Sequence, residues 1–203
     1  AWGPFTNKTY RASFTGMLNR SDGFWARDPA SALFLSELLR LPVSNVPSSP
    51  DIALSFKSKE EVDLKALLRR TYNFNGNEYV VISPNRHLYN RMDGEGKKSS
   101  YLLGIREVAK DFLAKDLSVI FMSNEMDESS GKLEDDRMLC VMLSRMFEAE
   151  EAVYSSELWF SADQIQSILS GSEFIVASRY HTAILGLAIG KPVYSIGWSH
   201  KYK

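Results

Sequence analysis

The chain has 203 residues, of which 44% are hydrophobic and 24% are charged, and these proportions are ordinary for a soluble globular protein. The formal net charge of −1 provides no overall field that would attract nucleic acid or an anionic membrane, so any affinity for anions has to be local. The single cysteine, Cys140, excludes an intramolecular disulfide framework and a multi-cysteine metal site. Because Cys140 lies in the apolar stretch RMLCVML, we expect a buried structural thiol rather than a nucleophile.

Signals for membranes and export are missing from the sequence. No apolar stretch approaches the ~18 residues of a transmembrane helix, and no signal peptide opens the chain, so we expect a cytoplasmic protein. The chain begins with AWGPF, without an initiator Met, and stops at SHKYK, where a new element would start. We therefore expect it to be incomplete at both ends.

The first part of the chain predicts one helix followed by a linker. The stretch DPASALFLSELLRL (28–41) offers Asp28 as an N-cap with Pro29 at the first helical position, and its apolar residues recur on one face. The stretch NVPSSPDIALSF (45–56) is rich in Pro and Ser, which predicts a loop that leads into a short strand. We place a domain boundary or linker near residues 46–60.

From residue 59 onward the pattern alternates between helices and strands. It predicts helices at 59–72, 101–115, 133–147, 161–172 and 181–190, and strands at 79–83, 117–123, within 152–161, at 173–178 and at 191–198. Ser161 and Gln164 have the form of a capping box, and Gly171 is expected just past the end of that helix. Continuous apolar strands separated by helices indicate a parallel sheet covered on both faces. The predicted fold is a doubly wound, Rossmann-like α/β domain over about residues 76–203.

Ligands of an open α/β sheet bind at the carboxyl ends of its strands, and this rule selects the candidate site residues. Polar side chains follow four of the predicted strands: Asn85, Arg86, His87, Asn90 and Arg91; Asn124, Glu125 and Asp127; Arg179, Tyr180 and His181; and Ser199, His200 and Lys201. All three histidines of the chain lie at these strand ends. A solvated loop position is an equal alternative for Arg91 and Lys201, and a surface position without a task is the preferred interpretation of His87.

Several familiar site motifs are absent from the sequence. Neither GxGxxG nor GxxxxGK[ST] occurs, so a dinucleotide site or a P-loop lacks its local support. There is no HExxH, and three scattered histidines argue against a zinc site.

The turn SRYH, at residues 178–181, combines three features that suit an anion. The helix that follows begins with unpaired backbone N–H groups, and Arg179 adds a planar, permanently charged fork. His181 can donate or accept a proton near neutral pH. An anion-binding catalytic turn explains these features, and so does a structural arrangement in which Arg179 pairs with a carboxylate and His181 caps the helix. The chemistry alone leaves both interpretations open.

The stretch FIVASRYHTAILGLAIGKPVYSIGWSHKY resembles the polysaccharide pyruvyl transferase family, whose members carry an Arg-x-His motif after a buried strand. A helix of small residues, a Gly-x-Pro turn and a further strand then follow in the family, as they do here. The earlier pieces AWGPF, ARDPASALFLSELL, SSPDIAL and EDD agree in order. The resemblance covers essentially the whole chain and is most specific at its end.

The resemblance implies a fold similar to the GT-B glycosyltransferases, in which two Rossmann-like domains face a cleft. Residues 1–55 would be the terminal part of the N-terminal domain with its linker, and residues 56–203 the C-terminal, donor-binding domain. The family transfers a pyruvyl group from phosphoenolpyruvate to two hydroxyls of a sugar, which forms a cyclic ketal in cell-surface or exopolysaccharide biosynthesis of the bacterial envelope. Phosphoenolpyruvate is the donor substrate, no cofactor is implied, and the acceptor is a saccharide or a lipid-linked oligosaccharide.

The resemblance also assigns roles to individual residues. Arg179 matches the motif Arg and would hold the anionic groups of the donor, and His181 matches the motif His and would protonate the methylene carbon as general acid. Asn85, Arg86 and Lys201 are expected to bind substrate. In many members of the family, the strand that matches YVVIS (79–83) leads into an Arg almost at once, whereas here Asn85 stands at about that place and Arg86 one residue later.

An acidic element of the family matches Asp135 and Asp136. Orientation of the acceptor and capping of the following helix are its two candidate roles, and capping is preferred.

Two other functions are compatible with the sequence. A GT-B glycosyltransferase that uses a nucleotide sugar would share the fold and the basic helix start, with Glu125 or Asp127 on the ribose hydroxyls. A non-catalytic saccharide-binding relative is the second alternative, and the presence of both Arg179 and His181 argues mildly against it.

Overall fold

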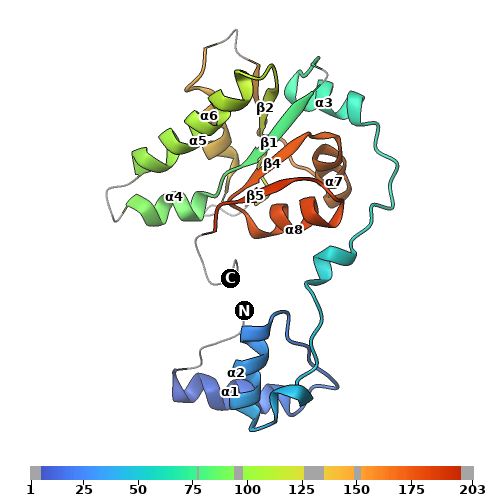
Figure 1. The fold of residues 1–203 in the computed structure, drawn as a ribbon, viewed down its shortest axis with the longest axis vertical. Helices are drawn as coiled ribbons and strands as arrows, with labels where there is room; N and C mark the ends of the chain where they lie inside the picture. The colour runs from blue at the N-terminus through green and yellow to red at the C-terminus, as the bar shows by residue number, and fades with distance from the viewer. Residues whose placement is uncertain (1–5, 77, 94–97, 126–134, 149–151, 198–203) are drawn as a thin grey trace. The chain divides into compact units, whose positions relative to one another are not determined.

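The computed structural model describes residues 6–76, 78–93, 98–125, 135–148 and 152–197 of the chain (Figure 1). These residues form two compact units, Ala1–Ser55 and Phe56–Lys203. Each unit has its own hydrophobic core.

The first unit consists of helices α1 (Lys8–Leu18) and α2 (Pro29–Leu39) with the short 3-10 helices η1 (Val43–Asn45) and η2 (Ile52–Ser55). Helix α2 starts as predicted, because Asp28 is its N-cap and accepts the backbone N–H of Ser31. An isolated parallel bridge joins Ala26 to Ser48. The core of the unit contains Leu18, Ala26, Ala32, Leu35, Leu38 and Val46.

Two features of this unit differ from the sequence prediction. Helix α1 was not predicted, although its apolar residues Tyr10, Phe14, Met17 and Leu18 recur at helical spacing; Leu18 is buried and Phe14 packs against the core of the unit. The strand predicted at the end of residues 45–56 is wrong, because Ile52–Ser55 forms η2 instead. The carboxylate of Asp51 accepts the backbone N–H of Ala53, which turns the chain there, and Ile52 is 86% exposed, so a strand would have had nothing to bury.

The second unit is an α/β domain built on a five-stranded sheet. Its elements are α3 (Leu64–Tyr72), β1 (Tyr79–Ser83), α4 (Arg86–Asp93), α5 (Lys98–Leu113), β2 (Ser118–Phe121), α6 (Arg137–Ser144), β3 (Val153–Ser155), α7 (Ala162–Gly171), β4 (Phe174–Ala177), α8 (Tyr180–Ala188) and β5 (Val193–Ser195). All strand pairs are parallel, and the strand order is β3-β2-β1-β4-β5. The sheet, flanked by helices, confirms the predicted Rossmann-like fold.

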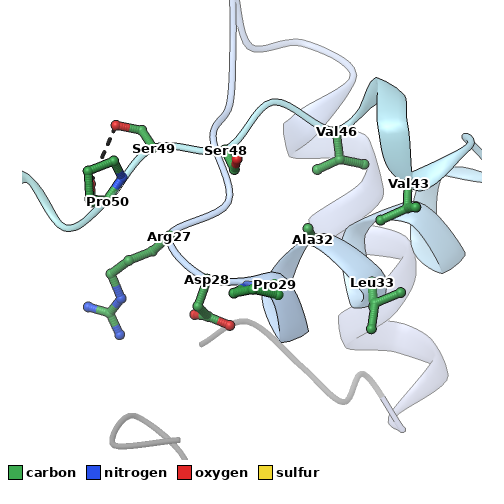
Figure 2. Close-up of a pocket in the computed structure, with 10 residues that line it drawn as sticks. All are labelled: Arg27, Asp28, Pro29, Ala32, Leu33, Val43, Val46, Ser48, Ser49 and Pro50. Atoms are coloured by element: carbon green, nitrogen blue, oxygen red, sulfur yellow. Dashed lines mark hydrogen bonds between the residues drawn. The ribbon is translucent and has the colours of Figure 1, made fainter.

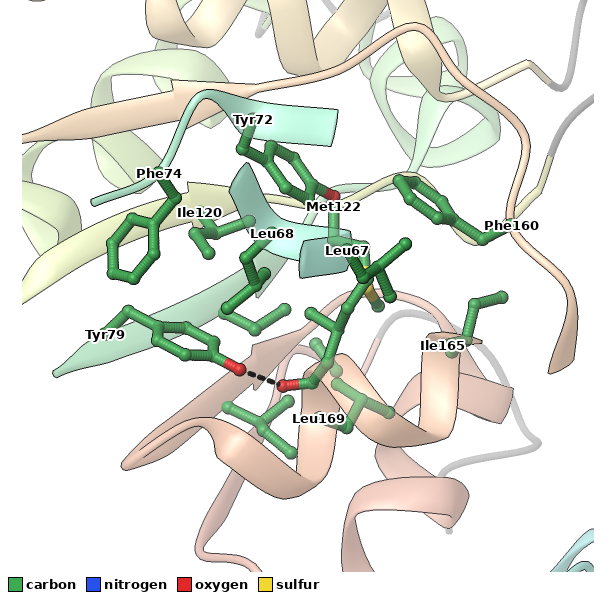
Figure 3. Packing of buried hydrophobic residues seen from close by; sticks show 14 of the residues in the cluster. Leu67, Leu68, Tyr72, Phe74, Tyr79, Ile120, Met122, Phe160, Ile165 and Leu169 are labelled. Carbon is green, nitrogen blue, oxygen red and sulfur yellow. Dashed lines mark hydrogen bonds between the residues drawn. The ribbon is translucent and has the colours of Figure 1, made fainter. Parts of the chain in front are cut away.

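Helices cover both faces of the sheet (Figure 1). Helices α3, α7 and α8 pack on one face, where Tyr79 donates a hydrogen bond from Oη to the carbonyl oxygen of Ile168 at 2.7 Å (Figure 3). Helices α4, α5 and α6 pack on the other face. Cys140 is buried in this second core, and burial raises the pKa of its thiol, so the predicted structural thiol is confirmed.

Local signals correctly predicted several helix ends, but the end of α7 differs by one residue and α4 was not predicted. Ser161 and Gln164 form the predicted capping box, although Gly171 is the last residue of α7 rather than the residue after it. The sequence prediction left residues 84–91 as a strand-end loop, whereas the structure forms α4 there. Leu88 and Tyr89 of this helix are buried against the sheet, and this contact stabilises a segment whose composition is mostly polar.

The seating of α8 on the sheet can be tested at Gly186. A Cβ at this position would lie 2.7 Å from Cδ1 of Ile175 and 2.8 Å from Cγ2 of Val193, so Gly186→Ala is expected to lower the free energy of unfolding by ~1–3 kcal/mol. Gly104 is the matched control, because it also lies inside a helix but a Cβ there would meet nothing within 4 Å. Gly104→Ala should raise the free energy of unfolding by ~0.5–1 kcal/mol. Urea denaturation measures both; equal effects of the two substitutions would contradict this packing.

Candidate functional site

The candidate site lies where the order of the strands reverses, between β1 and β4. From β1 the chain proceeds outward to β2 and β3, and it then returns to place β4 on the other side of β1. The two turns that follow β1 and β4 are tied together: the backbone N–H of Ser178 donates to the carbonyl oxygen of Ser83, and the hydroxyls of Ser83 and Thr182 are 3.1 Å apart. This position is the one at which open α/β sheets bind ligands.

Asn85 lies buried between these two turns. Its amide nitrogen donates to the carbonyl oxygen of Ser178 at 3.1 Å, and its amide oxygen accepts the backbone N–H of Leu88 at 2.9 Å. The first bond joins the end of β1 to the end of β4, and the second caps α4. The predicted substrate-binding residue Asn85 thus positions two loops of the site.

Tyr101 of α5 completes this network, and the sequence analysis did not single it out. Its Oη accepts the backbone N–H of Asn85 at 3.0 Å and donates to Oγ of Ser178 at 3.0 Å. Burial raises the pKa of Tyr101 to about 12, so the phenol is neutral and able to donate at physiological pH. The sequence could not predict this role. Tyr101 is one apolar position of an amphipathic helix, and that pattern does not indicate whether the hydroxyl of a buried Tyr forms hydrogen bonds.

The central interaction of the site is an ion pair between Arg179 and Asp136. Nε and Nη2 of Arg179 donate to the two carboxylate oxygens of Asp136, each at 2.8 Å. The same carboxylate also accepts the backbone N–H groups of Arg86 at 2.8 Å and of Glu125 at 3.2 Å. One fully buried carboxylate therefore joins the segments that follow β1, β2 and β4.

The charge state of Asp136 follows from these contacts. Burial raises the pKa of Asp136, while the hydrogen bonds from Arg179, Arg86 and Glu125 oppose that rise. A buried carboxylate that accepts a bidentate Arg fork and two backbone N–H groups is held in its charged form near neutral pH.

The structural interpretation of the SRYH turn, an Arg179–carboxylate pair with His181 as helix cap, is confirmed in part. Arg179 does pair with a carboxylate, as that alternative required, and it is also the N-cap residue of α8. His181 does not cap the helix: it is the second residue of α8, it is exposed, and its ring meets that of Tyr180 edge-on with the centroids 5.8 Å apart.

The outer edge of the Arg179 guanidinium faces a more accessible carboxylate. Nη1 of Arg179 lies 3.3 Å from Oε2 of Glu125, whose side chain is 48% exposed. Asp136 therefore fixes Nε and Nη2 of Arg179, while Nη1 is directed toward the half-exposed carboxylate of Glu125.

Arg86 is a second cation at this edge of the sheet. Its guanidinium lies over the ring of Tyr89, with Cζ 5.3 Å from the ring centroid. Nε of Arg86 is buried without a hydrogen-bond partner among the residues that the structure describes. An unsatisfied buried donor of this kind is costly, and a bound acceptor atom would remove the cost.

The structure describes only some of the other predicted residues. His87 and Arg91 are exposed on α4. Asp127, Ser199, His200 and Lys201 lie outside the described residues.

Asp135, next to the buried carboxylate, has a separate partner. It forms an ion pair with Arg137, whose guanidinium lies over the ring of Trp159 with Cζ 5.1 Å from the centroid. Oδ1 of Asp135 accepts the backbone N–H of Arg137, so this residue, rather than Asp136, provides the side-chain hydrogen bond at the start of α6.

In the part of the chain that the structure describes, no three His, Cys, Asp or Glu side chains are grouped in a way that could hold a metal ion. Nor does any helix of that part have the length and apolar character needed to cross a membrane.

The buried ion pair can be tested with two neighbouring aspartates. Asp136→Asn removes the buried negative charge that the Arg179 fork and two backbone N–H groups share, and we expect it to lower the free energy of unfolding by ~3–5 kcal/mol. Asp135→Asn is the control; because its partner Arg137 is more accessible to water, we expect a loss of ~1 kcal/mol. Chemical denaturation of the two variants measures the difference. Similar losses for both would show that Asp136 is no more important than its neighbour.

The buried phenol predicts a dependence of stability on alkaline pH. The unfolded chain releases the Tyr101 proton near pH 10, whereas the folded protein keeps it until about pH 12, so the free energy of unfolding falls as the pH rises between these values. Tyr101 contributes up to ~1.4 kcal/mol per pH unit to this slope. Tyr101→Phe is expected to make the slope shallower by that amount, measured by denaturation at a series of pH values. An unchanged slope would contradict the proposed burial of the phenol.

One comparison with known proteins identifies the family of the chain. A family model described as polysaccharide pyruvyl transferase matches residues 1–200. Searches of the curated proteins and of the solved structures found no match. The family match includes the Arg179 turn, the segment of Asp136 and both compact units, and it spans nearly the whole chain. The chain therefore belongs to the polysaccharide pyruvyl transferase family.

Proposed function

We propose that this protein transfers the pyruvyl group of phosphoenolpyruvate to two hydroxyls of a saccharide and thereby forms a cyclic ketal. The observation that carries the proposal is the position of Arg179: it stands at the start of α8, at the reversal of the strand order, and Asp136 holds it in one orientation. Family membership supports a transferase that acts on a saccharide. The donor and the ketal product belong to the proposal.

The anionic groups of phosphoenolpyruvate require several cationic or N–H donors. Arg179 would bind the donor through Nη1, where an anion would take the place of the half-exposed Glu125. Arg86 would contribute its guanidinium, whose Nε lacks an acceptor among the described residues. The first turn of α8 adds backbone N–H groups and the positive end of the helix dipole. Lys201 remains a further proposed ligand.

His181 is proposed as the general acid. It is the exposed second residue of α8, two residues after Arg179 in the sequence, which supports this role. In its protonated form it would give a proton to the methylene carbon of phosphoenolpyruvate, which becomes the methyl group, while carbon 2 becomes an oxocarbenium-like centre. A first sugar hydroxyl attacks carbon 2 and releases its proton. That proton returns to His181. A second hydroxyl then displaces the phosphate, its proton leaves with the phosphate as hydrogen phosphate, and the ketal ring closes.

The proposed reaction needs no organic cofactor, because the donor carries its own leaving group. We also propose that the acceptor is a saccharide or a lipid-linked oligosaccharide of cell-surface or exopolysaccharide synthesis, and that the reaction takes place in the cytoplasm. The two-domain, GT-B-like arrangement, with residues 56–203 as the donor-binding domain and residues 1–55 as part of the N-terminal domain, is part of the same proposal.

Calorimetric titration of the full-length protein with phosphoenolpyruvate tests the donor assignment. Wild type should bind, and Arg179→Lys, which keeps the charge opposite Asp136 but loses the planar fork, should bind at least ~10-fold more weakly. His181→Ala should still bind but lose ~10²–10⁴-fold in turnover, because only proton transfer is removed. His87→Ala is the matched control: His87 is likewise the exposed second residue of a helix that follows a strand, and its loss should leave turnover unchanged.

Two results would replace the proposal with another function. If wild type ignores phosphoenolpyruvate but binds a nucleoside diphosphate, the protein is a nucleotide-sugar glycosyltransferase, with Glu125 as a candidate for the ribose hydroxyls. If the protein binds saccharide without detectable turnover and His181→Ala changes nothing, it is a non-catalytic saccharide-binding relative.

A further inference from the structure

The second unit contains a cavity of about 350 Å³ beside α3, and this volume is within the range of small-ligand sites, about 300–1,000 Å³. Its walls come from α3, from the turn that follows α3, from the start of β1 and from the end of α7. We call this cavity the α3 pocket, after Leu64, Lys65, Leu68 and Arg69 of that helix, which form one of its walls. The pocket shares no residue with the Arg179 turn.

A larger cavity, of about 560 Å³, lies beside α2 in the first unit (Figure 2). Its lining contains one cation, Arg27, and one anion, Asp28, and both already have partners: Arg27 pairs with Asp51, and Asp28 accepts hydrogen bonds from Ser31. Its lining therefore has no net charge that a ligand would have to compensate. The α3 pocket differs from it in this respect.

The lining of the α3 pocket has an excess of positive charge. Lys65 and Arg69 line it, and none of its described lining residues is acidic. Because the two cations are four residues apart on α3, they are neighbours on the helix surface and repel each other. Neither side chain forms a hydrogen bond or an ion pair with any residue that the structure describes. Glu78 and Glu173, the acidic residues next to β1 and α7 in the sequence, do not line the pocket.

The inner wall of the α3 pocket is apolar and closely packed. Leu68, Phe74 and Tyr79 are buried, and the rings of Phe74 and Tyr79 meet edge-on with their centroids 5.4 Å apart (Figure 3). Gly171 approaches this wall so closely that a Cβ there would clash with Leu64 and with the hydroxyl of Tyr79. A wall packed in this way keeps its shape, which lowers the cost of ordering the site when a ligand binds.

Carbonyl oxygens at the ends of α3 and α7 are engaged within the protein. The carbonyl oxygen of Leu68 accepts the backbone N–H of Phe74 at 3.3 Å, and that of Ile168 accepts Oη–H of Tyr79 at 2.7 Å. Asn75 adds an exposed amide group that can donate to a ligand, since its side chain has no partner in the part of the chain that the structure describes. A pocket with apolar walls and charges of one sign concentrates counter-ions from solution.

We propose that the α3 pocket binds a phosphate monoester with an apolar body. The phosphate group would lie between Lys65 and Arg69, because a monoester carries about −1.5 to −2 charges at pH 7 and so matches two cations. The guanidinium of Arg69 can form two parallel hydrogen bonds to it. The apolar body would cover Leu64, Leu68 and Phe74. This site lies at the amino end of β1, so binding there does not depend on the proposed pyruvyl transfer at the carboxyl end of the sheet.

Methyl-detected NMR of the full-length protein tests this site, with phenyl phosphate as the probe. The readout is the methyl resonances of Leu64 and Leu68, whereas those of Thr182 and Ala183 in α8 report binding at the Arg179 turn. Phenyl phosphate should shift the Leu64 and Leu68 resonances in a saturable way. Inorganic phosphate and phenol, which each offer only one half of the ligand, should bind there at least ~10-fold more weakly.

A pair of neighbouring arginines provides the test variant and its control. Arg69→Gln should weaken phenyl phosphate at least ~10-fold, because it removes the planar cation while Gln still favours the helix. Arg70→Gln is the matched control, since Arg70 is also exposed in the last turn of α3 but does not line the pocket. Both substitutions remove the same charge from the end of the helix, so only the contact with the pocket differs.

The proposed site is supported if the shifts of Leu64 and Leu68 depend on Arg69 and not on Arg70. It is overturned if phenyl phosphate leaves these resonances unchanged, or if the two substitutions weaken binding equally. It is also overturned if phenol or inorganic phosphate binds as tightly as phenyl phosphate does. Shifts confined to Thr182 and Ala183 would overturn it as well, because they would place the ligand at the Arg179 turn.

Discussion

The carboxylate of Asp136 is the group on which the candidate site depends, because a charge removed from water has to be compensated by the protein around it. Here the compensation comes from the Arg179 fork and from the backbone N–H groups of Arg86 and Glu125. These partners follow three different strands of the sheet. The need to satisfy one buried charge therefore fixes the relative positions of three loops that have no regular hydrogen bonding of their own.

This constraint also determines what Arg179 can do. Two of its nitrogens are committed to Asp136, so the side chain cannot swing freely toward solvent, and its remaining edge has a defined direction. A guanidinium whose orientation is already fixed loses less conformational entropy on binding a planar anion than a mobile one does. The structural pair and the proposed anion site are thus compatible, because the first orients the second.

Asn85 and Tyr101 provide the neutral counterpart of this arrangement. Their hydrogen bonds connect the start of α4, the end of β4 and the first turn of α5 without adding charge. The site therefore rests on a rigid polar layer at the carboxyl end of the sheet, above the apolar cores on its two faces. A scaffold of this kind holds the Arg179 turn in place and leaves His181 exposed.

The sequence by itself determined the order of the sheet strands, the helices between them apart from α4, and the parallel sheet, because apolar periodicity and helix caps are local features. It also singled out the Arg179 turn as the candidate site. It missed α1 and α4, two short helices whose few apolar residues do recur at helical spacing. Only the tertiary structure decided that Arg179 pairs with Asp136, 43 residues earlier, and that Asn85 joins Ser178, because folding brings together groups that are distant along the chain. The physical reason is that satisfying a buried polar group depends on three-dimensional proximity, which leaves no periodic trace in the sequence.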